Sequence, residues 1–131
     1  MRKSPGGSTF PYYYKGGELH CLHFGSFFAD ETSLFARIGA EREFVLRNIA
    51  RMPVWVDLYE TELTGRVPAE LAAMIRAVGG RITKLAIVGC PARRRRRLSK
   101  AFAKEGVGTG PPLRYFDDPE VAKSWLVGKE P

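Results

Sequence analysis

The chain has 131 residues, of which 21 are lysine or arginine and 14 are aspartate or glutamate, for a formal net charge of +7. Its content of 44% hydrophobic and 27% charged residues is that of an ordinary globular protein and argues against disorder over most of the chain. No run approaches the ~18 consecutive apolar residues of a membrane span, and two cysteines are too few for a disulfide scaffold or a four-thiolate zinc site.

The first nine residues differ in composition from the rest of the chain. Residues 1–9 are rich in glycine, serine and proline, which indicates a flexible leader ahead of one domain spanning residues 10–131. A secretory signal peptide carries an apolar stretch after its basic N-terminus, but the segment at that place here, Ser4–Ser8, is made of serine, proline and glycine. This composition does not predict a signal peptide. We therefore expect a cytoplasmic protein with reduced cysteines.

The first predicted strands form a hairpin. The aromatic run Phe10–Lys15 and the segment Glu18–Phe24 flank Gly16 and Gly17, a pair typical of a tight turn between strands. Pro11 has no amide hydrogen to donate to a strand ladder, so the first strand is expected at an edge of the sheet.

From Asp30 onward, helical and strand-like patterns alternate. The predicted helices run from Asp30 to about Pro53, from Pro68 to Gly79, from Pro91 to about Lys104 and from Asp118 past Leu126. The predicted strands between them are Val54–Leu58, Ile82–Gly89 and Leu113–Phe116. With Glu18–Phe24 included, a strand precedes a helix four times. We predict an α/β fold with an N-terminal edge strand and four β-α units, joined by helical crossovers into a largely parallel sheet.

Three segments of the C-terminal half carry a resemblance to a known family. The segments "PVWVDLYETELTG", "ITKLAIVGCPARRRRRLSKAF" and "LRYFDDPEVAKSWLV" together resemble the STAS-like superfamily, in particular its SpoIIAA-like branch. The likeness covers about Leu19 to Val127. It implies an N-terminal edge strand followed by a four-turn β-α superhelix. It also implies a non-enzymatic module, like the anti-sigma-factor antagonists, transporter regulatory domains and small ligand-binding proteins of that superfamily.

The resemblance also implies a partner-binding loop. In the antagonist branch, a partner kinase phosphorylates a serine or threonine that precedes a glycine at the start of the second helix. The corresponding segment here is Glu62-Leu63-Thr64-Gly65, without the family's preceding Asp-Ser pair. Thr64 is therefore the implied phosphorylation site, and the implied partner-binding residues are Asp57, Thr61, Thr64, Gly65 and Arg66.

His20, Cys21 and His23 have side chains that bind metals, but their spacing does not favour a shared ion. Side chains alternate between the two faces of a strand, so His20 and His23 point in opposite directions. Zinc requires three or four converging ligands. We predict no metal site and no cofactor.

Cys90 and Asp57 each allow two interpretations. Cys90 lies between a strand and a helix N-terminus, where the helix dipole would favour a reactive thiolate; alternatively, it is a thiol packed beneath the loop. Asp57 ends a buried strand at the edge where α/β folds bind ligands; alternatively, it accepts hydrogen bonds from the following turn. The sequence contains no glycine-rich phosphate loop and no Ser-His-Asp pattern, so we predict no catalytic residues.

The most unusual feature is the run of five arginines from Arg93 to Arg97. At about 100° per residue, five consecutive side chains point all round a helix. Arg94 and Arg95 precede Leu98 by four and three residues, so they share its inward side and must extend along it to reach water. The remaining three, Arg93, Arg96 and Arg97, are candidates for anion binding; alternatively, the run is a solvated basic face.

We therefore expect a non-enzymatic binding or regulatory module that recognises a protein partner or a small ligand. One alternative is binding of nucleic acid or another polyanion through the arginine helix and the exposed tyrosines. Another is a carrier that holds a small hydrophobic ligand between helix and sheet. The sequence leaves the oligomeric state open, with a dimer among the options.

Overall fold

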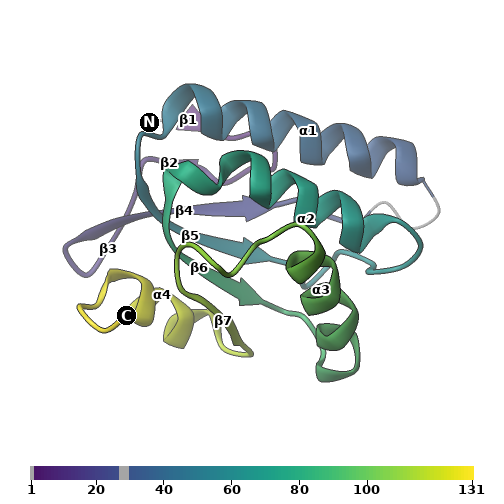
Figure 1. The fold of residues 1–131 in the computed structure, drawn as a ribbon. Helices are drawn as coiled ribbons and strands as arrows, with labels where there is room; N and C mark the ends of the chain where they lie inside the picture. The colour runs from purple at the N-terminus through teal and green to yellow at the C-terminus, as the bar shows by residue number, and fades with distance from the viewer. Residues whose placement is uncertain (1, 27–29) are drawn as a thin grey trace.

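Strands and helices alternate along the chain as the sequence predicts. Over residues 2–26 and 30–131, which the computed structural model describes, the chain forms a mixed five-stranded sheet, a two-stranded sheet and four α-helices (Figure 1). The strands are β1 (Arg2–Lys3), β2 (Thr9–Phe10), β3 (Tyr12–Tyr14), β4 (Gly17–His23), β5 (Met52–Asp57), β6 (Ile82–Val88) and β7 (Leu113–Phe116). The helices are α1 (Glu31–Asn48), α2 (Val67–Val78), α3 (Ala92–Lys104) and α4 (Pro119–Val127), with a 3-10 turn at Gly79–Arg81.

The five-stranded sheet has the order β3-β4-β5-β6-β7. β3 pairs antiparallel with β4 across a turn at Lys15 and Gly16, both of which have positive φ. The other three pairs are parallel, as expected for strands joined by helices. Pro11 directly precedes β3, the edge strand, which agrees with the prediction made from its missing amide hydrogen.

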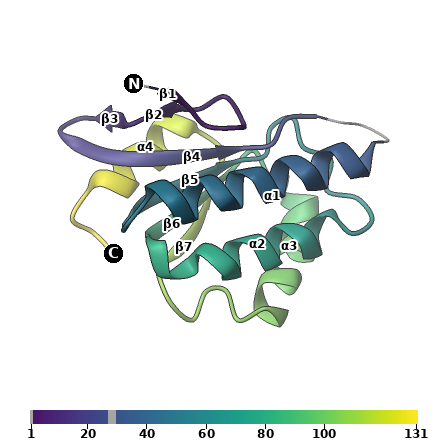
Figure 2. The ribbon, with the colours of Figure 1, turned by 90° about the horizontal axis from the view of Figure 1, so that it is seen from above.

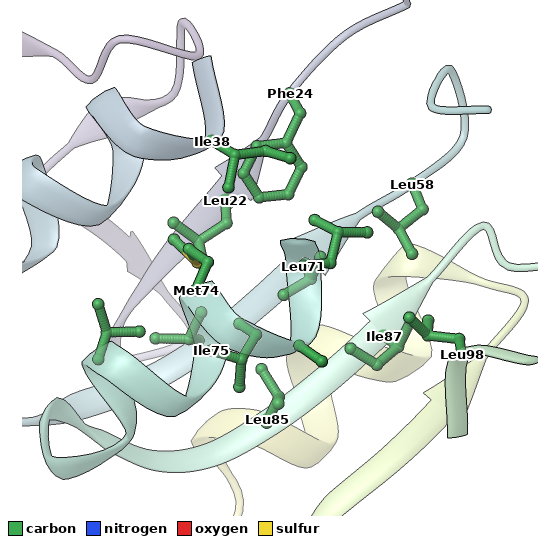
Figure 3. Close-up of a cluster of buried hydrophobic side chains, with 14 of the residues drawn as sticks. Leu22, Phe24, Ile38, Leu58, Leu71, Met74, Ile75, Leu85, Ile87 and Leu98 are labelled. Atoms are coloured by element: carbon green, nitrogen blue, oxygen red, sulfur yellow. The ribbon is translucent and has the colours of Figure 1, made fainter. Parts of the chain in front are cut away.

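Helices cover both faces of this sheet. α1, α2 and α3 lie on one face and α4 lies on the other (Figures 1 and 2). The larger core, between the sheet and α1–α3, is built from aliphatic side chains of strands and helices (Figure 3), among them Leu22, Ile38, Met74, Ile87 and Leu98. Burial of one such side chain contributes about 1.5–3 kcal/mol to the stability of the fold. The apolar faces of α1, α2 and α3 therefore determine how the three helices lie on the sheet.

The final helix closes the opposite face of the sheet. Trp125 is 7% exposed, and its ring centre lies 5.5 Å from that of Phe116 on β7. α4 begins where the sequence predicts: Oδ1 of Asp118 accepts a hydrogen bond from the Glu120 amide at 2.9 Å, and Pro119 is the first helical residue. The cap satisfies an amide that has no partner within the helix.

The first helix starts as predicted but ends earlier. Asp30 caps α1 by accepting a hydrogen bond from the Ser33 amide at 3.1 Å. The helix ends at Asn48, and Met52 and Pro53 belong to β5, so the predicted end near Pro53 was wrong. Pro53 cannot donate to the ladder, and the register between β5 and β6 shifts at this point. The apolar spacing of Met52 fitted the helix, but its side chain packs with the core from a strand.

The segment predicted as a flexible leader contains two short paired strands, β1 and β2. Between them, the Gly6 amide donates to Oε1 of Glu41 on α1 at 2.9 Å, and Glu41 is fully buried. A Cβ on Gly6 would lie 1.9 Å from the carbonyl oxygen of His23, so only glycine fits there. The leader therefore packs against both β4 and α1.

Candidate functional site

The carboxyl ends of β4, β5, β6 and β7 form one edge of the sheet, where open α/β sheets bind their ligands. The β5–α2 loop (Leu58–Arg66) lies at this edge. Thr61 and Leu63 are 8% and 4% exposed, and the Thr61 hydroxyl donates to the carbonyl of Gly25 at 3.0 Å. Glu62, which lies between these two residues, and Thr64, which follows Leu63, are exposed. The loop is thus anchored by alternate residues and presents the others to solvent.

Asp57 stabilises the start of this loop. Its Oδ1 accepts a hydrogen bond from the Tyr59 amide at 3.0 Å, which supports the structural interpretation of Asp57 over ligand binding. Tyr59, which the sequence analysis did not single out, is 59% exposed and donates its hydroxyl proton to the carbonyl of Asp117. Its backbone passes so close to Gly89 that a Cβ there would lie 2.7 Å from the Tyr59 nitrogen. Tyr59 therefore connects the ends of β5, β6 and β7.

The far end of the β5–α2 loop meets α1 and α3. Gly65 has φ +54, and a Cβ there would lie 2.7 Å from Oε1 of Glu31 on α1. Nη2 of Arg97 on α3 donates to the carbonyl of Gly65 at 2.8 Å. Arg66 pairs with Glu70 at 2.9 Å. The structure therefore brings the arginine run to the residue beside Thr64, although the two features lie more than 30 positions apart in the sequence.

The five arginines of α3 point in different directions, as the helical spacing predicts. Arg94 and Arg95 are half-buried, whereas Arg93, Arg96 and Arg97 are exposed. Nη2 of Arg95 lies 2.8 Å from Oδ1 of Asp117, and its Nε donates to the carbonyl of Cys90 at 3.2 Å. Arg95 thus joins the start of α3 to the end of β7. Of the three residues predicted to bind anions, Arg97 already uses one donor on Gly65.

A polar hollow of about 230 Å³ lies between the β5–α2 loop and the start of α3. Glu60 and Glu62 line it from the loop, and Arg93 and Arg94 line it from the helix. Oε2 of Glu60 is 3.8 Å from Nε2 of His23 on β4. The hollow is smaller than the roughly 300–1,000 Å³ of most small-molecule sites. Its two acidic and two basic side chains suit contact with the polar surface of another protein.

The structure favours a packing role for Cys90. Its side chain is 2% exposed, and burial raises the pKa of the thiol despite the nearby charge of Arg95. Sγ contacts the carbonyl of Pro91 at 3.8 Å. A nucleophile needs a lowered pKa and access to substrate, and this thiol has neither.

His20 and His23 do not converge. His20 is fully buried, stacks on Phe44 of α1 at 5.5 Å and meets Phe10 edge-on at 5.7 Å, and burial lowers its pKa to about 4. Nδ1 of His23 lies 3.2 Å from the carbonyl of Gly6. Burial also raises the pKa of Cys21 to about 12. Within residues 2–26 and 30–131, no three His, Cys, Asp or Glu side chains are placed to hold a metal ion.

The part of the chain that the structure describes also has hollows beside the helices, of which two bear on function. One, of about 300 Å³, lies at the amino ends of β6 and β7 and is lined by Ile75, Ile82, Leu85, Leu113 and the loop 106–111. The other, of about 500 Å³, is a groove between α2 and α3.

Comparison with known proteins identified no relative of this chain. No family model, curated protein or solved structure gave a significant match to this chain. Among the described helices, none has the length and apolar character needed to cross a lipid bilayer.

Proposed function

We propose that this protein is a non-enzymatic binding module with a STAS-like arrangement, which recognises a partner protein through the β5–α2 loop. The order of its elements supports this arrangement: an edge strand precedes four strand–helix units, and the last helix returns to the opposite face. The resemblance of the three C-terminal segments to the SpoIIAA-like branch supports it from the sequence.

The observation that carries the proposal is the construction of the loop. Thr61 and Leu63 hold it in the core, Gly65 fits against Glu31, and Arg97 bonds the Gly65 carbonyl. A loop fixed in this way loses little conformational entropy when a partner binds, so more of the contact energy contributes to affinity. Its exposed residues are Tyr59, Glu60, Glu62, Thr64, Gly65 and Arg66, of which the last three are contiguous in the sequence.

A phosphate on Thr64 is the regulatory step that this geometry supports. Thr64 is exposed and lies three residues before α2, whose N-terminus has no side-chain cap. The helix dipole and the nearby Arg66 and Arg97 would favour the added negative charge, whereas Glu62 would oppose it. Phosphorylation would then change the charge at the centre of the proposed contact surface.

Site-specific photo-crosslinking in the native host tests the proposal. A photo-reactive residue at position 64 should capture a defined partner, and the same residue at Ser124 should not. Ser124 is a matched control because it is exposed on α4, across the sheet from the loop. Equal capture from both positions, or none from position 64, would contradict the proposal.

A second candidate function rests on the apolar hollow at the amino ends of β6 and β7. Its volume of about 300 Å³ and its floor of Ile75, Ile82 and Leu85 would accommodate a small hydrophobic ligand. Native mass spectrometry of the protein purified from its host should then show a bound small molecule. Loss of that ligand from an Ile75→Trp variant that keeps its fold would support the carrier; ligand-free protein throughout would exclude it.

A further inference from the structure

A groove of about 500 Å³ separates α2 from α3 and differs in chemistry between its two sides. The α2 side consists of Pro68, Ala69 and Ala73, of which the two alanines are exposed and one helical turn apart. Their small side chains leave room for another chain to approach α2 closely. The two helices lie next to each other on the same face of the sheet, and Figure 2 shows α3 at an angle to α2.

The α3 side of the groove is positively charged. Arg97, Lys100 and Lys104 line it and recur at i, i+3 and i+7, so they share one face of the helix. Lys100 and Lys104 form no hydrogen bond or ion pair with any residue that the structure describes. Glu105, at the end of the row, is the one acidic residue lining the groove. The groove therefore has uncompensated positive charge along its length.

We infer that this groove docks an acidic amphipathic helix of a partner protein. Its carboxylates would face Arg97, Lys100 and Lys104, and its small apolar residues would lie on the alanines of α2. The inference goes beyond the proposed function, because the groove extends from Gly65 and Arg97, at the end of the β5–α2 loop, along α2 and α3, and because it specifies the charge and shape of the partner. It stands whether or not the β5–α2 loop binds.

The spacing of the cations favours a helix over a nucleic acid. From Arg97 to Lys104 the row extends about 10 Å, at about 1.5 Å per residue, and matches two turns of a helix with glutamates at i, i+3 and i+7. A phosphate backbone would gain nothing from the alanine side of the groove.

The test uses a labelled synthetic peptide of about 20 residues that forms an acidic amphipathic helix, with a scrambled peptide of equal charge as its control. Fluorescence anisotropy at low salt should show micromolar binding of the helical peptide and weaker binding of the scrambled one. The double variant Lys100→Gln/Lys104→Gln should weaken binding about fivefold, since exposed ion pairs contribute modestly. The variant Ala73→Trp, which fills the groove without changing charge, should abolish it.

Matched variants make the result specific to the groove. Arg51→Gln/Lys129→Gln removes the same charge at exposed positions elsewhere, and Ala36→Trp adds the same bulk at an exposed position of α1, outside the groove. Both control proteins should bind the peptide as wild type does. In an NMR titration of the wild-type protein with the peptide, the amide chemical shifts that change should belong to residues 65–73 and 97–105. Equal binding of both peptides, or equal loss in the control variants, would overturn the inference. So would an oligonucleotide that binds this surface more tightly than the peptide and is unaffected by Ala73→Trp.

Discussion

Arg97 donates a hydrogen bond from Nη2 to the carbonyl oxygen of Gly65 at 2.8 Å, across 32 positions of the sequence. This contact joins the middle of α3 to the end of the β5–α2 loop. Gly65 can accept it because its positive φ turns the loop toward α3 while its missing side chain leaves space for Glu31. One arginine of the run thus has a structural role at the proposed partner surface.

Replacement of Arg97 should loosen this loop. We expect Arg97→Ala to lower the free energy of unfolding by about 0.5–1.5 kcal/mol, the usual contribution of one hydrogen bond, and to speed amide exchange in residues 61–66. Urea denaturation and hydrogen exchange measure the two effects. Arg96→Ala, which changes an exposed neighbour with no such bond, is the control. Equal effects of the two substitutions would show that the Arg97–Gly65 contact does not hold the loop.

Trp125 should be a major source of stability on the second face of the sheet. It is 7% exposed and packs on Phe116, so Trp125→Ala should cost about 3–5 kcal/mol. Thermal or urea unfolding gives the value. Val121→Ala provides the control, because Val121 on the same helix is 53% exposed. A Trp125→Ala protein as stable as wild type would mean that α4 is not docked as described.

His20 should make the fold sensitive to acid. Its pKa is about 4 in the folded protein and about 6.5 in an unfolded chain, so only the unfolded state takes up this proton between those values. Stability therefore falls as pH drops from about 6.5 to 4, by about 3 kcal/mol from this group. In His20→Phe this component should vanish, and comparison of the two proteins by urea denaturation at pH 7 and pH 4.5 isolates it from the carboxylates. Parallel pH dependence of both proteins would contradict the prediction.

Thr64 should carry phosphate in the native host if the proposed switch operates. Intact-mass spectrometry of the protein from several growth conditions should then show a species heavier by one phosphate, absent from Thr64→Ala. Thr61→Val, which removes the other hydroxyl of the loop, should leave that species in place, because the Thr61 hydroxyl is buried and bonded to Gly25. Unmodified protein under every condition would retire the switch and leave the loop as a constitutive contact.

Binding of nucleic acid through the arginine run should be weak. Three or four arginines would engage phosphates, so the slope of log K against log salt should be near −3. Charge without contacts to base edges gives no sequence preference. Replacement of Arg93, Arg96 and Arg97 by glutamine should flatten the slope, and Arg51→Gln/Lys129→Gln should change it less. Sub-micromolar, sequence-dependent binding at physiological salt would instead favour the nucleic-acid alternative.

The local parts of the fold could be predicted because their causes are local. The caps at Asp30 and Asp118, the edge position after Pro11 and the alternation of strand and helix follow from residues close in the sequence. The predicted end of α1 was wrong because the position of Met52 fits the apolar face of a helix and a buried strand equally well. The pairing of β1 with β2 was missed because Gly6 packs against His23 and Glu41, both distant in the chain.

The sequence by itself determined which residues are available at the carboxyl edge and that five consecutive arginines must point all round α3. It also determined that Arg94 and Arg95 turn inward, since helical spacing places them beside Leu98. Only the tertiary structure decided what each arginine meets: Asp117 for Arg95, Gly65 for Arg97. Such pairs depend on how the sheet places α3 beside residues 22 and 32 positions away. The side-chain spacing within one helix holds no information about its neighbours.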